Sequence, residues 1–340
     1  MKLLKKMMQV GLAAIFFGFL ATNVVFADDS EGWHFVQENG RTYYKKGDLK
    51  ETDWRVINGK YYYFDSLSGE MVVGWQYIPA PYEGVTIGSS LRKDIAFRPD
   101  WFYFGQDGVL QEFVGKQVLE AKTATNTNKH HGEQYDSPAE KRVYYFEDQR
   151  SYHTLKTGWV YDEGHWYYLL KDGGFDARID SLTVGELARG WVKDYPLTYD
   201  EEKLKAAPWY YLDPETGIMR TGWQYLGNRW YYLRSSGAMA TGWYQEGSTW
   251  YYLDAENGDM KTGWQYLGNK WYYLRSSGAM ITGWYQDGST WYYLNAGNGD
   301  MKTGWFQVNG KWYYAYSSGA LAVNTTVDGY SVNYNGEWVR

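Results

Sequence analysis

The C-terminal part of the chain repeats one short pattern of aromatic, glycine and polar positions. Each copy opens with Gly-Trp, and a second tryptophan seven residues after the first begins a Trp-Tyr-Tyr run. Successive copies start 20 or 21 residues apart, with their first tryptophans at Trp223, Trp243, Trp264, Trp284 and Trp305. A fixed period of this size indicates a repeat architecture, in which each copy forms one supersecondary unit.

Each copy predicts a β-hairpin, because Asp-Gly and Asn-Gly between short aromatic runs are strong turn signals. Folding about Asp287-Gly288 sets Trp284 opposite Trp291, whereas the Asn309-Gly310 turn is offset by one residue and leaves the register of its copy open. Opposite residues share a face, so we expect the two indoles of a copy to lie together. Because side chains alternate along a strand, the second tyrosine of each run is expected on that same face, and the first tyrosine on the opposite face.

A loop of small residues, such as 235–240, joins each hairpin to the next copy. A lone two-stranded hairpin is only marginally stable in water, so the hairpins are expected to stack. Aromatic residues make up 20% of the 340 residues, with 19 Trp and 36 Tyr, and the aliphatic content suits no large globular core. The pattern therefore predicts an all-β solenoid of stacked hairpins.

Converging indole and phenol faces attract a soft organic cation, as in the aromatic cages that recognise quaternary ammonium groups. At about 0.5–2 kcal/mol per contact, three rings supply about 2–5 kcal/mol, which corresponds to a site of millimolar affinity. Several such sites facing a polymer that repeats the ligand would gain avidity. The alternative is that the aromatic residues are purely structural, because a thin hairpin stack needs large side chains to form any core.

The segment Gly263–Trp284 carries the pattern Gly-Trp-x6-Trp-Tyr-Tyr-Leu-x3-Gly-x-Met-x-Thr-Gly-Trp. This pattern resembles the choline-binding repeat of pneumococcal surface proteins, strongly so over Gly222–Arg340, and the whole chain is similar to the repeat-only members of that family. The resemblance implies a left-handed superhelix of β-hairpins. It also implies binding sites between consecutive repeats, each made of two tryptophans from one repeat and a tyrosine from the next, often with a methionine nearby.

Carried onto this sequence, the resemblance implies four choline sites, with the second tyrosine of each pair chosen and the first left open. They are Trp223, Trp230 and Tyr252; Trp243, Trp250 and Tyr273; Trp264, Trp271 and Tyr293; and Trp284, Trp291 and Tyr314, with Met239, Met260, Met280 and Met301 in the linking loops as residues that could close the cages.

The chain divides by sequence into three parts. Residues 1–27 have a basic start, an apolar run and a small-x-small end, which is typical of a secretory signal peptide. Residues 28–208 read as divergent choline-binding-type repeats with insertions, and residues 209–340 as consensus repeats. In the divergent part, Gly115-Lys116 stands where Gly-Trp is expected, and we expect no site there. Sites at Trp159/Trp166 and at Trp191/Trp209 with Tyr232 are doubtful because insertions lengthen those repeats.

The remaining composition excludes several function classes. The net charge of −6, with no large basic patch, argues against nucleic acid as a partner. There is no cysteine, no Gly-x-Ser-x-Gly, no His-Glu-x-x-His and no phosphate loop. His130-His131 lie in a polar stretch that reads as a solvated tract, so no metal and no cofactor is expected. We predict a non-enzyme.

The sequence thus favours a secreted bacterial surface protein that is attached non-covalently through choline or phosphorylcholine of teichoic and lipoteichoic acids. The divergent half would present a protein-interaction surface, toward a cell-wall hydrolase or a host molecule. Choline-dependent dimerisation is left open. The alternative is a carbohydrate-binding (glucan-binding) repeat protein, because indole faces also stack on sugars.

Overall fold

The structure, a computed structural model, describes residues 32–80, 99–133, 140–149, 152–171, 181–196 and 200–339. The predicted signal segment, residues 1–27, lies outside the described residues. Within the described ranges, no helix is both long and apolar enough to cross a membrane. Among the described residues, the regular secondary structure is almost wholly short antiparallel strands, so the predicted solenoid of stacked β-hairpins is confirmed.

The chain packs into two units. The N-terminal unit is Met1–Thr157 with Ile179–Glu186, and the C-terminal unit is Gly158–Arg178 with Leu187–Arg340. The sequence-based division at residue 208 follows how closely the repeats match one another. The structural division follows packing, and it assigns two lengthened repeats to the C-terminal unit.

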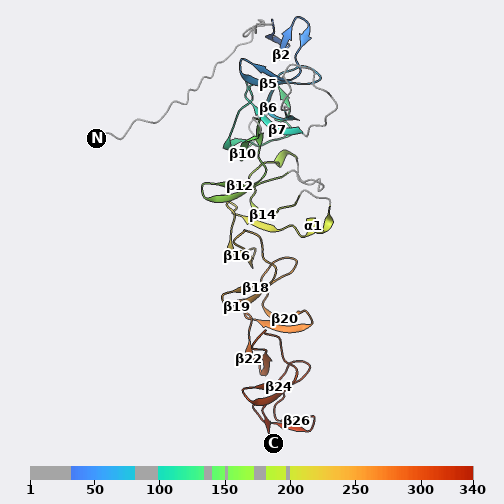
Figure 1. The fold of residues 1–340 in the computed structure, drawn as a ribbon, viewed down its shortest axis with the longest axis vertical. Coiled ribbons are helices and arrows are strands. Elements are labelled where there is room, and N and C mark those ends of the chain that lie inside the picture. The colour runs from blue at the N-terminus through green and yellow to red at the C-terminus, as the bar shows by residue number, and fades with distance from the viewer. Residues whose placement is uncertain are drawn as a thin grey trace, which may run out of the picture. The chain divides into compact units, whose positions relative to one another are not determined.

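The N-terminal unit contains hairpins and small three-stranded sheets (blue to green in Figure 1). Its elements are β1 (His34–Glu38), β2 (Arg41–Lys46), β3 (Leu49–Lys50), β4 (Asp53–Ile57), β5 (Lys60–Phe64), β6 (Val72–Pro79), β7 (Pro99–Phe104), β8 (Gly115–Glu120), β9 (Lys129–His130), β10 (Lys141–Gln149), β11 (Tyr152–Leu155) and the 3-10 turn η1 (Ser181–Thr183).

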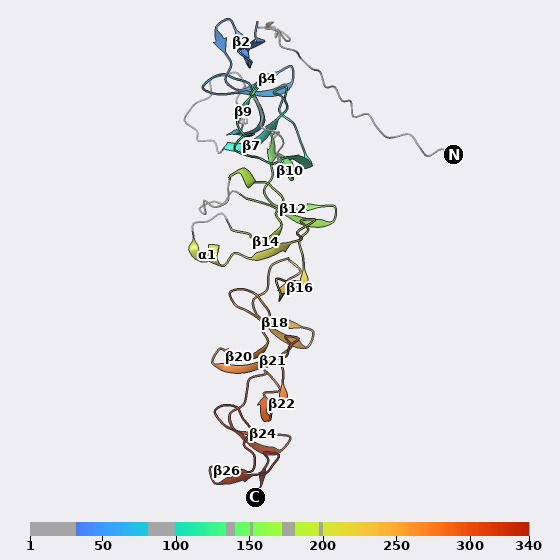
Figure 2. The ribbon, with the colours of Figure 1, turned by 180° about the vertical axis from the view of Figure 1, so that it is seen from behind.

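The C-terminal unit is a series of two-stranded hairpins that ends in a three-stranded sheet, and Figures 1 and 2 show its hairpins following one another in chain order. Its elements are β12 (Gly158–Asp162), β13 (His165–Leu169), β14 (Gly190–Lys193), α1 (Glu201–Lys205), β15 (Trp209–Leu212), β16 (Gly222–Leu226), β17 (Arg229–Leu233), β18 (Gly242–Glu246), β19 (Thr249–Leu253), β20 (Gly263–Leu267), β21 (Lys270–Leu274), β22 (Gly283–Asp287), β23 (Thr290–Leu294), β24 (Gly304–Val308), β25 (Lys311–Ala315), β26 (Thr325–Val327), β27 (Tyr330–Val332) and β28 (Trp338–Val339).

The register of the consensus hairpins differs from the one expected about Asp287-Gly288. Trp284 pairs with Tyr293, and Asp287 pairs with Thr290, so the turn residues are Gly288 and Ser289. Gly288 has φ +60°, as the first central residue of a type II′ turn requires. The predicted pairing of Trp284 with Trp291 is therefore wrong by two positions. The two indoles nevertheless share a face, because Trp291 lies two residues before Tyr293 on the same strand.

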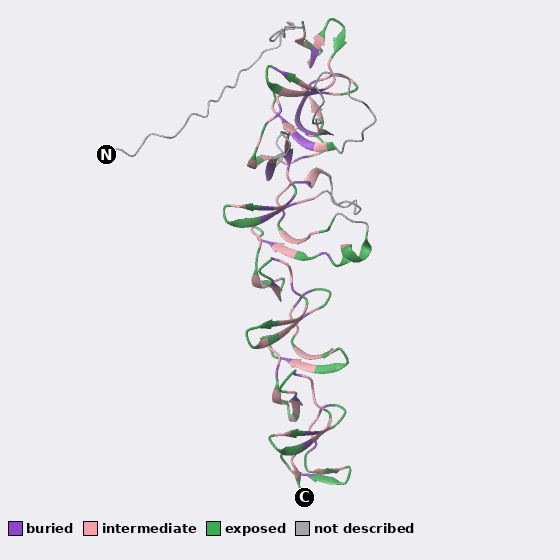
Figure 3. Ribbon diagram, viewed as in Figure 1, coloured by how far each residue is buried: buried purple, intermediate pink, exposed green. Residues whose placement is uncertain are grey.

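The core of the C-terminal unit is narrow and consists largely of the leucine that ends each Trp-Tyr-Tyr-Leu run. Leu233, Leu253, Leu274 and Leu294 are fully buried. Each leucine pairs with the glycine of Gly-Trp across its own hairpin, and each also bridges the methionine of the following loop. Figure 3 shows the consequence, since the hairpin tips are exposed while burial is confined to the line of contact between repeats.

Part of one insertion in the N-terminal unit is ordered by pairing with a repeat. β9 (Lys129–His130) pairs antiparallel with β6, and Asn126 is buried. The amide of Asn128 donates to the carbonyl oxygen of Trp75 over 2.7 Å. Residues 126–131 therefore form part of the packed unit.

Candidate functional site

The consensus repeats form a series of aromatic cages, each named here after its first tryptophan. In the Trp223 cage, the indoles of Trp223 and Trp230 stand nearly perpendicular, with ring centroids 6.5 Å apart at 81°. Tyr251 of the next hairpin is the third wall, with its ring centroid 4.9 Å from that of Trp223. Two walls thus come from the face of one hairpin that carries its two tryptophans. The third wall comes from the opposite face of the next hairpin, which carries the first tyrosine of its pair.

The same geometry recurs with little change in the following repeats. The Trp–Trp centroid distance is 6.4 Å in the Trp243, Trp264 and Trp284 cages, at 82–85°. The third wall stands 4.8–4.9 Å from the first tryptophan. The pairs that sequence analysis predicted are all brought together: Trp223 with Trp230, Trp243 with Trp250, Trp264 with Trp271, and Trp284 with Trp291.

The tyrosine that closes each cage is the first of its pair, not the second. Tyr251 faces Trp223, whereas Tyr252 packs on Trp243 of its own hairpin at 5.2 Å. The second tyrosine shares the face of its own tryptophans, so only the first points back toward the preceding repeat. The predicted placements of Tyr252, Tyr273, Tyr293 and Tyr314 against the preceding tryptophans are therefore corrected to Tyr251, Tyr272, Tyr292 and Tyr313.

The tryptophans of the cages are not simply core residues. Trp230, Trp271 and Trp291 are 42–44% exposed, whereas the leucines three positions after them are fully buried. Large aromatic side chains that only filled a core would be expected to lose this exposure, because burial of apolar area stabilises the fold. Their faces remain open to solvent beside a second and a third aromatic wall, which favours a binding role over a purely structural one.

The four loop methionines have a packing role. The sulfur of Met239 lies 2.5 Å from the position that a Cβ on Gly258 would take, and Met260, Met280 and Met301 meet the corresponding glycines of the next loops in the same way. The backbone amide of Met260 also donates to the carbonyl oxygen of Trp230 over 2.8 Å. Each methionine thus joins its loop to a cage tryptophan and to the following loop. Closure of a cage around ligand by these methionines stays a prediction.

A carboxylate lies beside every second cage. The indole Nε1–H of Trp223 donates to Glu246 over 3.1 Å, and that of Trp264 donates to Asp287 over 3.0 Å. Each acid ends the first strand of the next hairpin. At the corresponding strand end beyond Trp243 the chain has Leu267, and beyond Trp284 it has Val308. Cages with a nearby negative charge therefore alternate with uncharged ones.

Three of the protein's own cations near these cages are ion-paired with carboxylates elsewhere. Lys270, which precedes a cage tryptophan, contacts Asp300 over 2.9 Å, and Lys311 contacts Glu337 over 2.5 Å. Arg229 lies 3.6 Å from Asp259. Among the described residues, the ring faces of the cages from Trp223 onward have no lysine or arginine over them.

A further cage at the C-terminal end was missed in the sequence analysis. Trp305, Trp312, Tyr330 and Trp338 line a cavity of about 320 Å³, mostly apolar. The Nε1–H of Trp305 donates to Asp328 over 3.1 Å. The third wall comes from β27 and β28, which lack a Gly-Trp pair, so the repeat pattern did not identify them. The signal available was the spacing of Asp328, which follows its tryptophan by 23 residues as Glu246 and Asp287 follow theirs.

The lengthened repeats retain much of the same geometry. Trp159 and Trp166 have centroids 6.4 Å apart at 84°, and Tyr210 lies 4.6 Å from Trp159 across the insertion. Trp191 is faced by Tyr231 at 5.0 Å, again the first tyrosine of its pair and not the expected Tyr232. Insertions at the hairpin ends therefore leave the aromatic contacts between repeats in place.

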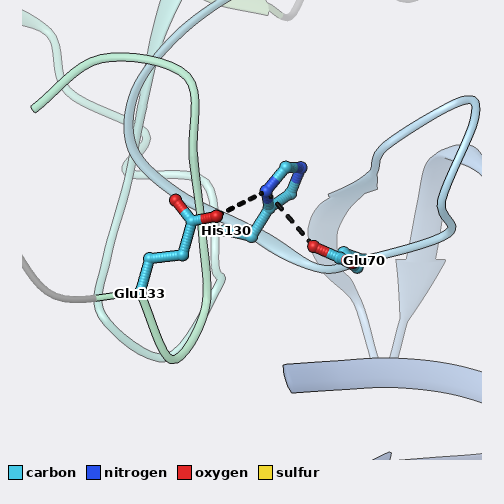
Figure 4. Close-up of side chains that lie close together, drawn as sticks. All are labelled: Glu70, His130 and Glu133. Atoms are coloured by element: carbon cyan, nitrogen blue, oxygen red, sulfur yellow. Dashed lines mark hydrogen bonds and ion pairs between the residues drawn. The ribbon is translucent and has the colours of Figure 1, made fainter. Parts of the chain in front are cut away.

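The two adjacent histidines of the N-terminal unit are not a solvated tract. His130 Nδ1 lies 3.3 Å from carboxylate oxygens of both Glu70 and Glu133, as Figure 4 shows, and these three groups have a spacing that could hold a metal ion. The guanidinium of Arg41 also bonds both carboxylates and supplies positive charge there. His131 bonds the hydroxyl of Thr42 over 2.7 Å, and burial lowers its pKa. The absence of a metal stays a prediction.

Comparisons with known proteins agree with the repeats described above. Residues 220–262 and 261–306 match the family model of the choline-binding repeat, and residues 52–71, 157–175 and 303–321 match that of a putative cell wall binding repeat. A search of curated protein sequences gave no match.

Two solved structures from Streptococcus pneumoniae are similar over nearly the whole chain. CbpJ of strain TIGR4 is 68% identical, and the match covers 91% of this chain and 100% of CbpJ with a TM-score of 0.80. Choline-binding protein F is 60% identical, and that match covers 92% of this chain and 100% of its own with a TM-score of 0.82. By the matched repeats and by these two relatives, the chain belongs to the family of choline-binding proteins.

Proposed function

We propose that the chain is a non-catalytic surface protein that binds choline residues of teichoic and lipoteichoic acids through its aromatic cages. The observation that carries this proposal is the repeated cage in which three aromatic walls enclose a partly exposed space with no cation of the protein over the rings. The quadrupoles of indole and phenol rings attract a quaternary ammonium group, and desolvation between the walls strengthens that attraction.

The carboxylates beside alternate cages support the same ligand. Glu246, Asp287 and Asp328 each accept a hydrogen bond from a cage indole. A negative charge next to an aromatic cage favours a cation and disfavours a neutral sugar. Two unit charges at about 4 Å attract by about 1 kcal/mol in bulk water, and by more where water is partly excluded.

Repetition of weak sites suits attachment to a polymer. A single three-ring cage contributes about 2–5 kcal/mol, which is a millimolar affinity. Cages at regular intervals can engage several choline groups of one teichoic acid chain, and each further contact then becomes intramolecular. This supports non-covalent attachment to the cell wall after secretion. A relative, choline-binding protein F, has a solved structure in the presence of a peptidoglycan analogue.

We also propose that the N-terminal unit presents a protein-interaction surface, whose partner is a cell-wall hydrolase or a host molecule. The insertions of this unit give it a surface that the near-identical consensus repeats lack. A choline-dependent dimer through the C-terminal cage is a separate outcome, which sedimentation with and without choline would reveal.

The test is isothermal titration calorimetry of the chain with choline, and separately with purified teichoic acid. We expect a saturable millimolar response to choline that loses two sites in a Trp264→Ala/Trp284→Ala double variant. Tyr334→Ala is the matched control, because Tyr334 is an aromatic residue 73% exposed outside the cages. No response to choline from folded protein would contradict the proposal. A response to glucan oligosaccharides that excess choline does not displace would favour the carbohydrate-binding alternative.

A further inference from the structure

The N-terminal unit contains an aromatic cage with the construction of the Trp223 cage. Trp75 in β6 and Trp101 in β7 have ring centroids 6.3 Å apart at 86°, compared with 6.5 Å and 81° in the Trp223 cage. Tyr144 in β10 is the third wall, 4.8 Å from Trp75 at 58°, where the Trp223 cage has 4.9 Å and 61°. Three rings thus stand in nearly the same mutual arrangement.

Strand pairing shows that these rings also occupy equivalent repeat positions. Gly74 pairs with Phe104 as the glycine of each consensus Gly-Trp pairs with the last residue of its Trp-Tyr-Tyr-Leu run. Gly115 pairs with Phe146 in the same way, although Lys116 has replaced the tryptophan after it. Tyr144 stands two residues before Phe146, so it is the first tyrosine of its run, the residue that closes the consensus cages.

This cage is occupied by the ammonium group of Lys122. Its Nζ lies 4.6 Å from the ring centroid of Trp75, 5.3 Å from that of Trp101 and 4.4 Å from that of Tyr144. Lys122 is only 4% exposed, and its Nζ donates to the carbonyl oxygen of Val184 over 2.7 Å. Among the described residues, no other lysine or arginine lies over three aromatic rings.

The loop that carries Lys122 is fixed on both sides of the residue. Asn126, itself 3% exposed, accepts a bond from the amide of Thr123 over 2.7 Å and donates to the carbonyl oxygen of Ala121 over 2.8 Å. The indole Nε1–H of Trp75 donates to the carbonyl oxygen of Glu120 over 2.9 Å. The insertion between β8 and β10 therefore presents the lysine to the cage in one defined geometry.

A carboxylate accompanies the ammonium here, as one does beside the Trp223 cage. Glu186 lies close enough to lysine to act on its charge, and it accepts a bond from the hydroxyl of Tyr144 over 3.3 Å. Burial lowers the pKa of Lys122 to about 7, and Glu186 opposes that change. The rings, the carbonyl of Val184 and this carboxylate all favour the charged form of the lysine, and they act against the effect of burial.

We propose that Lys122 is a built-in ligand, which fills the Trp75 cage as choline fills the cages of the C-terminal unit. This proposal rests on the proposed function for its account of the consensus cages. A tethered ammonium competes at a high effective concentration, so millimolar choline does not displace it. The N-terminal unit is then complete without choline, and this cage takes no part in attachment. Removal of the lysine side chain would leave a site for a primary alkylammonium ion.

Chemical rescue tests this assignment. Lys122→Ala removes the atoms of the side chain beyond Cβ, and n-propylammonium has the carbon chain and nitrogen that are lost. We expect Lys122→Ala to lower the thermal unfolding midpoint of the N-terminal unit, and n-propylammonium to raise it again in a saturable way. The neutral 1-propanol, of the same size, should give no comparable recovery. If Lys122→Ala does not fold alone, the yield of native protein on refolding with each additive provides the same comparison.

Two further variants separate charge from packing. Lys122→Met keeps a long apolar side chain in the cage without the charge, and we expect it to lose stability with no rescue by n-propylammonium. Lys116→Met is the matched control, because Lys116 lies exposed on β8 of the same sheet. A Lys122→Met protein as stable as the unaltered chain, or equal rescue by n-propylammonium and 1-propanol, would overturn the proposal.

Choline binding by the unaltered chain and ammonium rescue of Lys122→Ala test the proposed function and this proposal separately. If the unaltered chain binds choline but Lys122→Ala shows no ammonium-specific rescue, the built-in ligand is refuted and choline binding stands. If the unaltered chain binds no choline while the rescue succeeds, the C-terminal cages need another ligand and the assignment of Lys122 is retained.

Discussion

At the scale of single residues, the position of a tyrosine within its pair decides its role. Tyr292 closes the Trp264 cage at 4.9 Å, whereas its neighbour Tyr293 packs on Trp284 of its own hairpin at 4.9 Å. The alternation of a strand follows from the sequence. Which of the two tyrosines contacts the tryptophan of the preceding hairpin depends on how the hairpins stack. That stacking cannot be predicted from the tyrosine pair alone.

We predict that Tyr292→Leu weakens choline binding at the Trp264 cage while Tyr293→Leu leaves that cage intact. Loss of one cation–π wall should cost about 0.5–2 kcal/mol, or about twofold to thirtyfold in affinity. Calorimetric choline titrations of both variants, with thermal unfolding to exclude global damage, check this. Weaker binding at the Trp264 cage in Tyr293→Leu alone would restore the assignment made from the sequence.

The position of Lys122 in the Trp75 cage could not be predicted from the sequence. Trp75 and Trp101 could be recognised as degraded repeat residues from their Gly-Trp and Trp-Phe-Tyr-Phe surroundings. The lysine lies within a polar insertion, 47 residues after Trp75, and no local pattern marks it. Its place in the cage depends on the pairing of β8 with β10 and on the loop bonds of Asn126.

At the scale of elements, the hairpins were predictable and their turns were less so. The Asn309-Gly310 turn lies where the sequence placed it, with φ +49° and +82°. At Gly288 the Asp-Gly signal suggested a turn one residue too early, because Gly-Ser satisfies a type II′ turn equally well. Since the error shifts the pairing by two residues, it leaves each side chain on its predicted face.

The contact between successive loops gives a test of how the hairpins stack. We predict that Gly258→Ala destabilises the C-terminal unit more than Gly247→Ala does. Both glycines have positive φ, but a Cβ on Gly258 would lie 2.5 Å from the sulfur of Met239, whereas one on Gly247 meets open space. The backbone penalty, about 1 kcal/mol or more, is common to both. Urea unfolding of the two variants measures the difference, and equal destabilisation would argue against the methionine contact.

The loop that follows the run ending at Leu253 is expected to respond to acid. Asp254 accepts backbone bonds from Glu256 and Asn257 and pairs with Lys261, and these contacts lower its pKa to about 2. A carboxyl group with a folded pKa below its unfolded value of about 4 stabilises the fold above that value, and the effect is lost as pH falls from about 4 to about 2.

We therefore predict that Asp254→Asn is less stable than the unaltered chain at pH 6 and that the two converge near pH 2. The asparagine oxygen preserves a hydrogen-bond acceptor, so the difference reports mainly on the charge. Denaturant unfolding across this pH range supplies the measurement. A difference that stays constant with pH would mean that the charge of Asp254 contributes nothing to the stability of the loop.

At the scale of the molecule, one repeated contact is used in two ways. In the C-terminal unit the cages are open to solvent, and alternate ones have a carboxylate beside them. In the N-terminal unit the Trp75 cage is buried around the chain's own lysine. The family and its repeat architecture could be predicted from the spacing of Gly-Trp pairs. The difference between the cage that holds the chain's own lysine and the cages that are open to solvent could not be predicted, because it depends on contacts between residues far apart in the sequence.

The most direct test of the account compares choline with 3,3-dimethyl-1-butanol, its neutral isostere, by tryptophan fluorescence of the chain. The two ligands have nearly the same shape and differ in the charge at one atom. If the cages act through cation–π attraction, choline should give a saturable millimolar response and the alcohol a response at least about tenfold weaker. Equal responses to both ligands would show that the cages recognise apolar shape, and would contradict the central claim that they are sites for a cation.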